Sequence, residues 1–281
     1  MIDPADPNQL LQLLHRHRID LKKSLGQNFL VDPPLRDRIV EAAGVSSEDE
    51  VLEVGAGAGT LTVALAQRCR RLVAVELDHR FIPVLHEVVG ALTNVEIVQS
   101  DILRLNQARE FPNGGHIVAG NIPFNLTGAL VRKLLDTSPR PRRLSLVVQK
   151  EVAERWRATG GASLATVAVQ VFATVDLLFT IPASAFTPAP RVDSACVVLE
   201  VRERPAVDVP DLDAFFRLVE AVFQFRRKQL GGALGRISGM GSTSAGARLR
   251  ESGIDPERRP QTLTLSEWET VYREFNPGPS R

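Results

Sequence analysis

The sequence predicts an α/β protein in which a mostly parallel sheet is followed by a small helical domain. Short, continuous apolar runs alternate with helical stretches as far as residue 149. Strands of this kind are buried on both faces, which is typical of a parallel sheet covered by helices. Two further apolar runs follow, and beyond about residue 205 the apolar residues recur with helical spacing.

The predicted elements of the sheet follow one another in a regular order. We expect strands at 50–54, 71–76, 95–99, 116–119 and 143–149. We expect helices at 61–70, 81–89 and 128–136, and Pro83 falls in the first turn of the second, where proline is tolerated. The runs 168–180 and 195–201, joined by a Pro-rich connection at 182–190, predict an antiparallel pair appended to the sheet.

The chain divides into three predicted parts. Residues 1–20 form a helical or partly disordered arm, residues 21–205 the sheet domain, and residues 206–281 the helical domain. The boundary lies near 204–210, where the strand pattern ends. The helical domain holds a periodic segment at 212–225, a Gly- and Ser-rich segment at 231–246, and a last helical segment at 265–275.

Composition and charge limit the class of protein. The net charge is +1, but residues 132–157 carry eight Lys/Arg against three Asp/Glu, and residues 217–259 carry nine against four. Two basic segments in a nearly neutral chain fit either a face that binds a phosphate backbone or solvated helix surfaces. Cys69 and Cys196 have no metal-ligand spacing and suit a reducing cytosol. We expect a cytoplasmic protein with no membrane-spanning segment and no metal.

A glycine-rich turn and two acidic residues stand at the ends of the first three strands. The run Glu53-Val54-Gly55-Ala56-Gly57-Ala58-Gly59 leaves strand 50–54, and its glycines let the backbone approach a ligand closely. Glu76 ends the second strand and can accept both ribose hydroxyls of a nucleoside, while Asp101 can accept from an adenine amine. Together they predict a nucleoside site. Taken singly, they also fit a packing turn, a helix cap and a loop acid.

The turn Asn121-Ile122-Pro123-Phe124, at the end of the fourth strand, suits chemistry on an adenine amine. The lone pair of that amine is delocalised into the ring. Two acceptors, the Asn121 side-chain oxygen and the Ile122 carbonyl, would localise it toward an incoming methyl. Pro123 stiffens the turn, and Phe124 offers a face for stacking an extruded base. Catalysis would then rest on placement and electrostatics, although the same tetrapeptide also fits a simple strand-closing turn.

Several segments in one order resemble the ribosomal RNA adenine dimethyltransferases of the KsgA type, over nearly the whole chain from about Leu21 to Phe275. The segments are Leu25-Gly26-Gln27-Asn28-Phe29-Leu30, Glu53 to Gly59, Glu76, Asp101, Asn121 to Phe124, Phe186-Thr187-Pro188-Ala189-Pro190-Arg191-Val192-Asp193-Ser194 and Phe225-Arg226-Arg227-Lys228.

The resemblance implies a class I, Rossmann-like methyltransferase fold. It implies a mostly parallel seven-stranded sheet with a terminal antiparallel hairpin, and an all-helical C-terminal domain that binds RNA. It also implies an S-adenosylmethionine-dependent enzyme that dimethylates N6 of two adjacent adenosines in a hairpin loop near the 3′ end of small-subunit rRNA. The enzyme would act during ribosome assembly, and we expect it to be a monomer.

The resemblance also implies roles for single residues. Asn28, Leu30, Gly55 and Gly57 would line the cofactor site, with Gly55 at the amino-acid part of the cofactor. Glu76 would contact its ribose, Asp101 its adenine, and Asn121 both the cofactor and the target amine. Phe186 would be a second stacking face, and Arg226, Arg227 and Lys228 would contact RNA phosphates.

One position departs from the resemblance, and two other functions stay open. Family members usually have Tyr where this chain has Phe124, so the stacking face is kept and a hydroxyl is lost.

An Erm-type enzyme would use the same fold and chemistry on large-subunit rRNA and give macrolide resistance. The run 223–234 followed by Gly253-Ile254-Asp255-Pro256 favours the small-subunit type. A non-catalytic RNA-binding assembly factor would be marked by decayed cofactor motifs, which this chain does not have.

Overall fold

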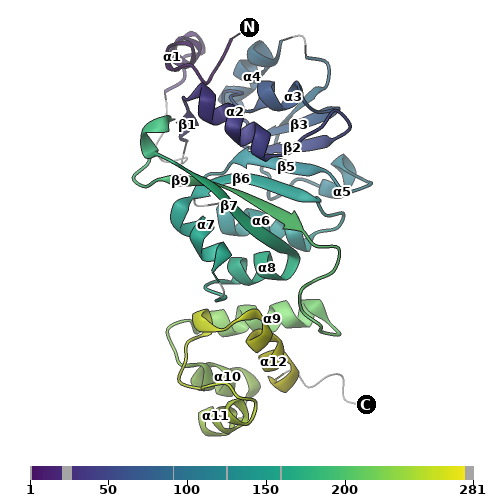
Figure 1. Ribbon diagram of the computed structural model, residues 1–281, viewed down its shortest axis with the longest axis vertical. Coiled ribbons are helices and arrows are strands. Elements are labelled where there is room, and N and C mark those ends of the chain that lie inside the picture. Colours follow the sequence, from purple (N-terminus) through teal and green to yellow (C-terminus); the bar gives the residue numbers. More distant parts are fainter. Residues whose placement is uncertain (1, 21–26, 91, 125, 159, 276–281) are drawn as a thin grey trace. The chain divides into compact units, whose positions relative to one another are not determined.

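A computed structural model describes residues 2–20, 27–90, 92–124, 126–158 and 160–275 of the chain (Figure 1). The fold separates into two compact units. The first comprises Met1–Glu154 and Thr174–Val201, and the second comprises Arg155–Ala173 and Arg202–Arg281. Leu25 and Gly26, the first two residues of the N-terminal motif, lie outside the described residues.

The first unit contains a seven-stranded sheet with the order β4-β3-β2-β5-β6-β9-β7. The strands from β4 to β6 run parallel, and β9 pairs antiparallel with β6 in the register Gln149↔Ser194 to Arg143↔Glu200. The predicted α/β class with a mostly parallel sheet is therefore confirmed. The strands are β2 (Glu50–Val54), β3 (Arg71–Glu76), β4 (Val95–Gln99), β5 (Ile117–Asn121), β6 (Arg143–Gln149), β7 (Ala173–Ile181) and β9 (Ser194–Val201).

Helices cover both faces of this sheet, and Figure 1 shows α2 and α6 on opposite sides of it. The predicted helices are present, with α3 shorter than expected. The helices and 3-10 turns of this unit are α1 (Pro7–Arg16), α2 (Pro33–Ala42), α3 (Thr62–Ala66), η2 (His79–Phe81), α4 (Ile82–Val89), α5 (Gln107–Glu110), α6 (Thr127–Asp136) and η3 (Ala183–Ala185). Helix α7 (Lys150–Arg157) carries the chain from the first unit into the second.

The strand predicted at 168–180 is wrong in its first part. Residues Leu164–Phe172 form the helix α8, and β7 begins at Ala173. Ser163 caps the helix by accepting the backbone N–H of Thr166 at 3.1 Å. The helix is mostly buried, and Thr166 and Gln170 are its polar residues, too few to mark a polar face in the sequence. A continuous apolar run of this length fits a buried helix and a buried strand equally well.

Two elements near the N-terminus have no counterpart in the prediction. Helix α2 starts at the cap Asp32, whose side chain accepts the N–H of Leu35 at 2.9 Å. Strand β1 (Phe29–Leu30) pairs antiparallel with β8 (Phe186–Thr187), with Leu30 opposite Phe186. The arm before them is ordered as α1. Its buried leucines share an apolar core with Phe29 and with the side chains of α4.

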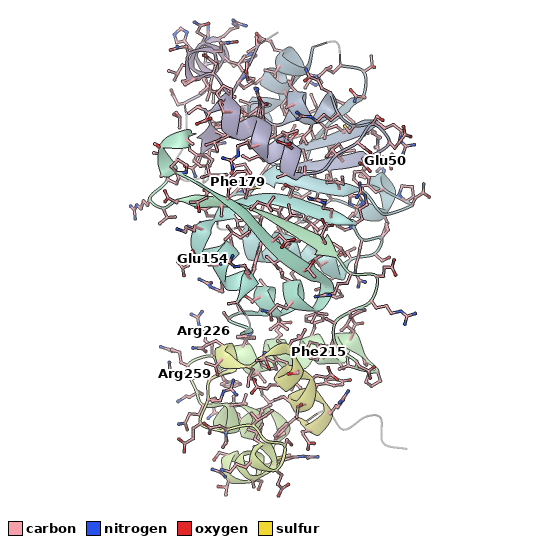
Figure 2. The ribbon with its side chains drawn as sticks, in the orientation of Figure 1. Glu50, Glu154, Phe179, Phe215, Arg226 and Arg259 are labelled. Carbon is pink, nitrogen blue, oxygen red and sulfur yellow. The ribbon has the colours of Figure 1, made fainter. Side chains whose placement is uncertain are left out.

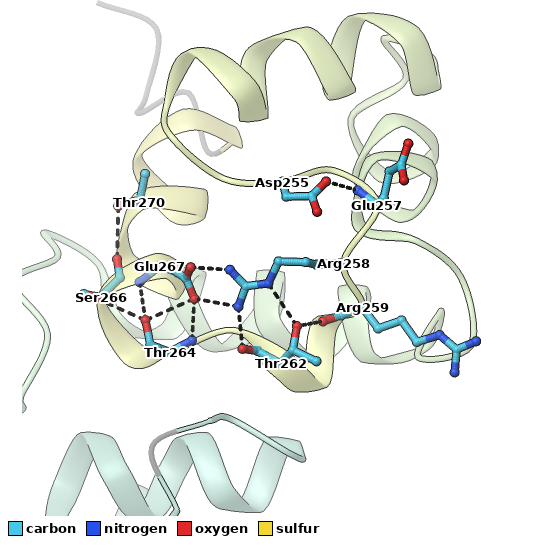
Figure 3. Close-up of polar contacts among 9 residues, drawn as sticks. All are labelled: Asp255, Glu257, Arg258, Arg259, Thr262, Thr264, Ser266, Glu267 and Thr270. Carbon is cyan, nitrogen blue, oxygen red and sulfur yellow. Dashed lines mark hydrogen bonds and ion pairs between the residues drawn. The ribbon is translucent and has the colours of Figure 1, made fainter.

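The second unit is helical and is held together by aromatic packing. Phe172 stacks on Phe216 with ring centroids 5.6 Å apart, and Phe223 contacts Trp268 at 5.5 Å. In the loop before its last helix, Arg258 donates to Thr262 and Glu267, as Figure 3 shows. Besides α8, the elements are α9 (Leu212–Phe223), α10 (Leu230–Ser238), α11 (Ser242–Glu251), η4 (Pro260–Thr262) and α12 (Leu265–Phe275).

Candidate active site

A cavity of about 450 Å³ opens at the carboxyl ends of β2, β3, β4 and β5. This is the edge at which open parallel sheets bind ligands. Every predicted site residue of the sheet domain lines this one cavity, although the segments that carry them are spread over more than half of the chain. These residues are Asn28, Leu30, Gly55, Gly57, Glu76, Asp101, Asn121, Ile122, Pro123, Phe124 and Phe186.

The glycine-rich turn is held against the end of β3. Gly57 has a φ of 55°, and a Cβ on it would lie 3.0 Å from the Cε1 of Phe29. Its N–H donates to Glu76 Oε2 at 2.8 Å, and the N–H of Asp78 donates to Glu76 Oε1 at 2.8 Å. Burial raises the pKa of Glu76, whereas the two N–H donors oppose that rise. Each carboxylate oxygen retains a lone pair for a ligand.

Glu53 is a buried acid beneath the same turn that sequence reasoning did not single out. Its residue is 1% exposed, and its Oε2 has no hydrogen-bond partner among the described residues. Burial, together with the nearby charge of Glu76, raises the pKa of the Glu53 carboxyl to about 8. Glu53 is therefore mostly protonated at neutral pH. Its place inside the glycine motif was visible in the sequence, but its burial was not.

The Asn121 turn is fixed by contacts on both sides. A Cβ at Gly120 would lie 2.5 Å from the carbonyl oxygen of Val54, so only glycine lets β5 approach β2 this closely. The Asn121 Nδ2 donates to the backbone carbonyl of Asn28 at 2.8 Å, and the N–H of Ile122 donates to Val147 at 3.0 Å. Since a carbonyl can only accept, the Asn121 amide orientation is set. Its Oδ1 then remains the acceptor end of the side chain.

Two aromatic rings and Asp101 complete the predicted lining. Phe186 is 4% exposed, and the β1–β8 pairing places it opposite Leu30. Phe124 is partly buried. Asp101 accepts the N–H of Leu103 at 2.9 Å, which holds its carboxylate at the end of β4.

Further lining residues were missed by sequence reasoning. Gln27 Nε2 donates to Asp78 Oδ2 at 2.9 Å and joins the N-terminal segment to the turn after β3. Hydrogen bonds from the Arg80 side chain lower the pKa of Asp78 to about 2. Leu77, which is 65% exposed, offers an apolar surface beside them. The signal available for Gln27 was its place in the N-terminal motif, next to Asn28.

Arg226, Arg227 and Lys228 belong to the second unit. They lie in the turn that follows α9, and all three are exposed (Arg226 is labelled in Figure 2). None of the three forms an ion pair with a described residue.

Among the described residues there is no candidate metal site and no helix that could span a membrane. No group of three or more His, Cys, Asp or Glu among the described residues could hold a metal ion. Within the same residues, none of the helices is long and apolar enough to cross a bilayer. Cys69 and Cys196 are both free and buried.

Comparisons with known proteins agree over nearly the full length. The model of the ribosomal RNA adenine dimethylase family matches residues 18–276. Ribosomal RNA small subunit methyltransferase A of Shouchella clausii is 39% identical, and the match covers 95% of this chain and 93% of that protein. The protein of the same name from Pelotomaculum thermopropionicum is also 39% identical, with 98% of both chains covered.

Two solved structures share the fold. A dimethyladenosine transferase from Plasmodium falciparum has a TM-score of 0.71 and 26% identity, covering 87% of this chain and 96% of that one. The 23S rRNA methyltransferase ErmE has a TM-score of 0.68 and 27% identity, covering 89% of this chain and 100% of that one.

Proposed function

This chain belongs to the ribosomal RNA adenine dimethylase family, and from that premise we propose the reaction that it catalyses. It transfers methyl groups from S-adenosylmethionine to N6 of two adjacent adenosines in the 3′-terminal hairpin loop of small-subunit rRNA. It acts as a monomer in the cytoplasm, on a pre-ribosomal particle. The observation that carries the proposal is the single cavity that gathers the glycine turn, Glu76, Asp101 and the Asn121 turn.

The donor set of the cavity fits S-adenosylmethionine. Glu76 offers carboxylate oxygens for ribose hydroxyls, and Asp101 offers an acceptor for the adenine amine. Gly57 lies so close to the ring of Phe29, which also lines the cavity, that a side chain there would force the two apart. The Oε2 of Glu53, which has no partner among the described residues, leaves one buried polar atom for the ligand or its water. When bound, the donor supplies a methyl group activated by its sulfonium.

The residues of this chain prepare the target nitrogen. Because Asn121 Nδ2 is committed to the carbonyl of Asn28, its Oδ1 is free to accept from the adenine amine. The Ile122 carbonyl is the second acceptor, and the two together localise the nitrogen lone pair toward the methyl. Pro123 stiffens the turn that carries both acceptors. The rate enhancement comes from this placement and from charge complementarity, with no strong base required.

Phe124 and Phe186 hold the extruded base. Both rings line the cavity, and a flat apolar face is the usual support for a flipped base. Phe124 replaces the Tyr usual in the family and keeps this face, so we infer that stacking does not depend on the hydroxyl.

In the second unit, the exposed Arg226, Arg227 and Lys228 contact RNA phosphates. Their joint replacement by Ala therefore weakens RNA binding and flattens its salt dependence.

The small subunit is favoured over the large one by the relatives. The proteins with 39% identity over nearly the whole chain carry the small-subunit name, whereas ErmE is 27% identical.

The activity is tested by incubating the purified protein with labelled methyl donor and immature small subunits. The expected result is label in the small-subunit rRNA. Primer extension on both rRNAs of a deletion strain locates the missing groups. Loss of methylation in the large subunit alone would favour the Erm-type function, and no incorporation at all would favour a binding protein.

A further inference from the structure

The basic segment 132–157 is not a uniform cationic surface. Most of its Lys and Arg side chains are engaged within the protein. Lys133 donates to the carbonyl of Leu103 at 2.7 Å, and Arg142 pairs with Asp49 at 2.8 Å. Arg132, Arg140, Arg143 and Arg155 have partners too. Within the first unit, Lys150 is the member of this segment whose side chain forms no hydrogen bond or ion pair with a described residue.

Lys150 follows the carboxyl end of β6, the strand next to the catalytic turn. Val147, three residues earlier, pairs with Asn121 and accepts the N–H of Ile122 at 3.0 Å. The N–H of Lys150 donates to the carbonyl of Asp193 at 3.0 Å. The exposed ammonium of Lys150 is thus carried by backbone that is hydrogen-bonded to the Asn121 turn on one side and to the loop before β9 on the other.

Arg191 lies in that same loop and is also exposed without an ion pair to a described residue. The loop starts beyond Phe186, which lines the cavity, and ends where Asp193 meets Lys150. Asp193 Oδ1 accepts the N–H of Ala183 at 3.0 Å, which ties the loop to the turn before β8. Val192 beside it is 46% exposed. Lys150 and Arg191 form no ion pair with a described residue, and they thus belong to backbone segments that are hydrogen-bonded to the Asn121 turn or continue the chain from Phe186.

We propose that Lys150 and Arg191 form a cationic rim that binds the backbone phosphates next to the target adenosine. The inference rests on the proposed function. A base that enters the cavity leaves its own sugar and phosphates outside, where they need cations that no carboxylate of the protein has neutralised. Lys150 and Arg191 meet this condition, and their backbones are fixed to the elements that hold the base. They act as positioning residues, since they contact the RNA backbone and not the reacting atoms.

The test compares a double variant, Lys150→Ala with Arg191→Ala, against the wild-type protein and a matched control. The control is Arg68→Ala with Arg109→Ala, which removes two exposed cations that form no ion pair with a described residue and that precede the amino ends of β3 and β5. Binding to immature small subunits is measured between 50 and 200 mM salt. Removing two phosphate contacts lowers the salt slope by about 1.4 to 1.8. Between 50 and 200 mM salt, the affinity of the wild-type protein then falls by a factor that is about 7 to 12 times larger than the factor for the double variant.

Three readouts separate phosphate binding from a change in the fold. The affinity for S-adenosylmethionine stays at the wild-type value in the double variant, and the KM for the ribosomal substrate rises. The charge-retaining pair Lys150→Arg with Arg191→Lys restores the salt slope. If the double variant has the salt slope and KM of the control, the rim does not exist. Failure of the proposed function looks different, because the wild-type protein itself would then transfer no methyl group to small subunits.

Discussion

The amino and carboxyl ends of the parallel sheet differ in whether their charged side chains have partners within the protein. At the amino ends, several cations and acids pair with each other: Arg71 lies 2.7 Å from Glu96, and Arg142 lies 2.8 Å from Asp49. At the carboxyl ends, Asp78 and Arg80 also pair, but other ionisable groups have no partner among the described residues. Glu53 has a buried oxygen with no partner among the described residues, and Lys150 carries a free ammonium.

This difference separates stability from function within one sheet. Both ends are built by the same strands in the same register, so the backbone alone does not distinguish them. Polar groups that satisfy one another contribute to folding and leave nothing for a ligand. Polar groups left open cost stability until a ligand arrives, and such groups mark functional sites. His116, at the amino end of β5, breaks the pattern because it is buried and both its ring nitrogens lack partners among the described residues.

The largest effect is expected from two asparagines that make the same kind of bond at opposite ends. Asn121 donates to the carbonyl of Asn28, and Asn94 donates to the carbonyls of Ala66 and Cys69. Asn121→Ala should lower kcat by about 10²- to 10³-fold, because it removes an acceptor that acts on the target amine. Single-turnover methyl transfer measures this, with circular dichroism to check the fold.

Asn94→Ala is the matched control at the amino end. It should cost about 1–3 kcal/mol in the free energy of unfolding and leave kcat near the wild-type value, because its amide satisfies two backbone carbonyls. If Asn121→Ala kept a near-normal kcat, the Asn121 side chain would not be an acceptor that acts on the target amine. A large loss of kcat in Asn94→Ala would show that the two ends are not functionally separate.

The residues at the carboxyl end of the sheet could be placed from the sequence better than those at the amino end, for a physical reason. Parallel strands bring their carboxyl ends to one edge, so residues such as Glu76 and Asn121 could be placed together from strand order alone. Phe186 could be placed from the family resemblance but not from spacing, because the β1–β8 pairing joins segments more than 150 residues apart. The Gln27–Asp78 bond and the burial of His116 have no local sequence signature. The helix at Leu164–Phe172 was missed because its mostly apolar sequence, with Thr166 and Gln170 as its polar residues, shows no clear period.

A smaller effect, on stability, is expected at Glu53. Its pKa is raised from an ordinary value of 4.5 to about 8, so between these values the folded protein holds a proton that the unfolded chain has released. Stability therefore falls as pH rises, by about 1.4 kcal/mol per pH unit for this one group. Glu53→Gln keeps the shape of the protonated acid and should remove that slope. Urea unfolding of the ligand-free protein from pH 6.5 to 8 measures this pH dependence. If the free energies of unfolding of the wild-type protein and of Glu53→Gln changed in parallel with pH, Glu53 would not be the responsible group.

His116 should make the free energy of unfolding change with pH in the opposite direction, over a narrower range of pH. Burial lowers its pKa from 6.5 to about 4, so between these values the unfolded chain binds a proton that the folded protein does not. Stability is lost as pH falls through this window, by about 3 kcal/mol in total. His116→Phe, which can keep the stacking on Phe111, should abolish the loss, and His86→Phe on the exposed side of α4 is the control. Between pH 4.5 and 6.5 the Glu53 and His116 slopes offset each other, so the wild-type profile should be flatter than that of either variant. Urea unfolding across this range tests both residues at once, and a Glu53→Gln profile that does not fall toward acid would mean that His116 is not the opposing group.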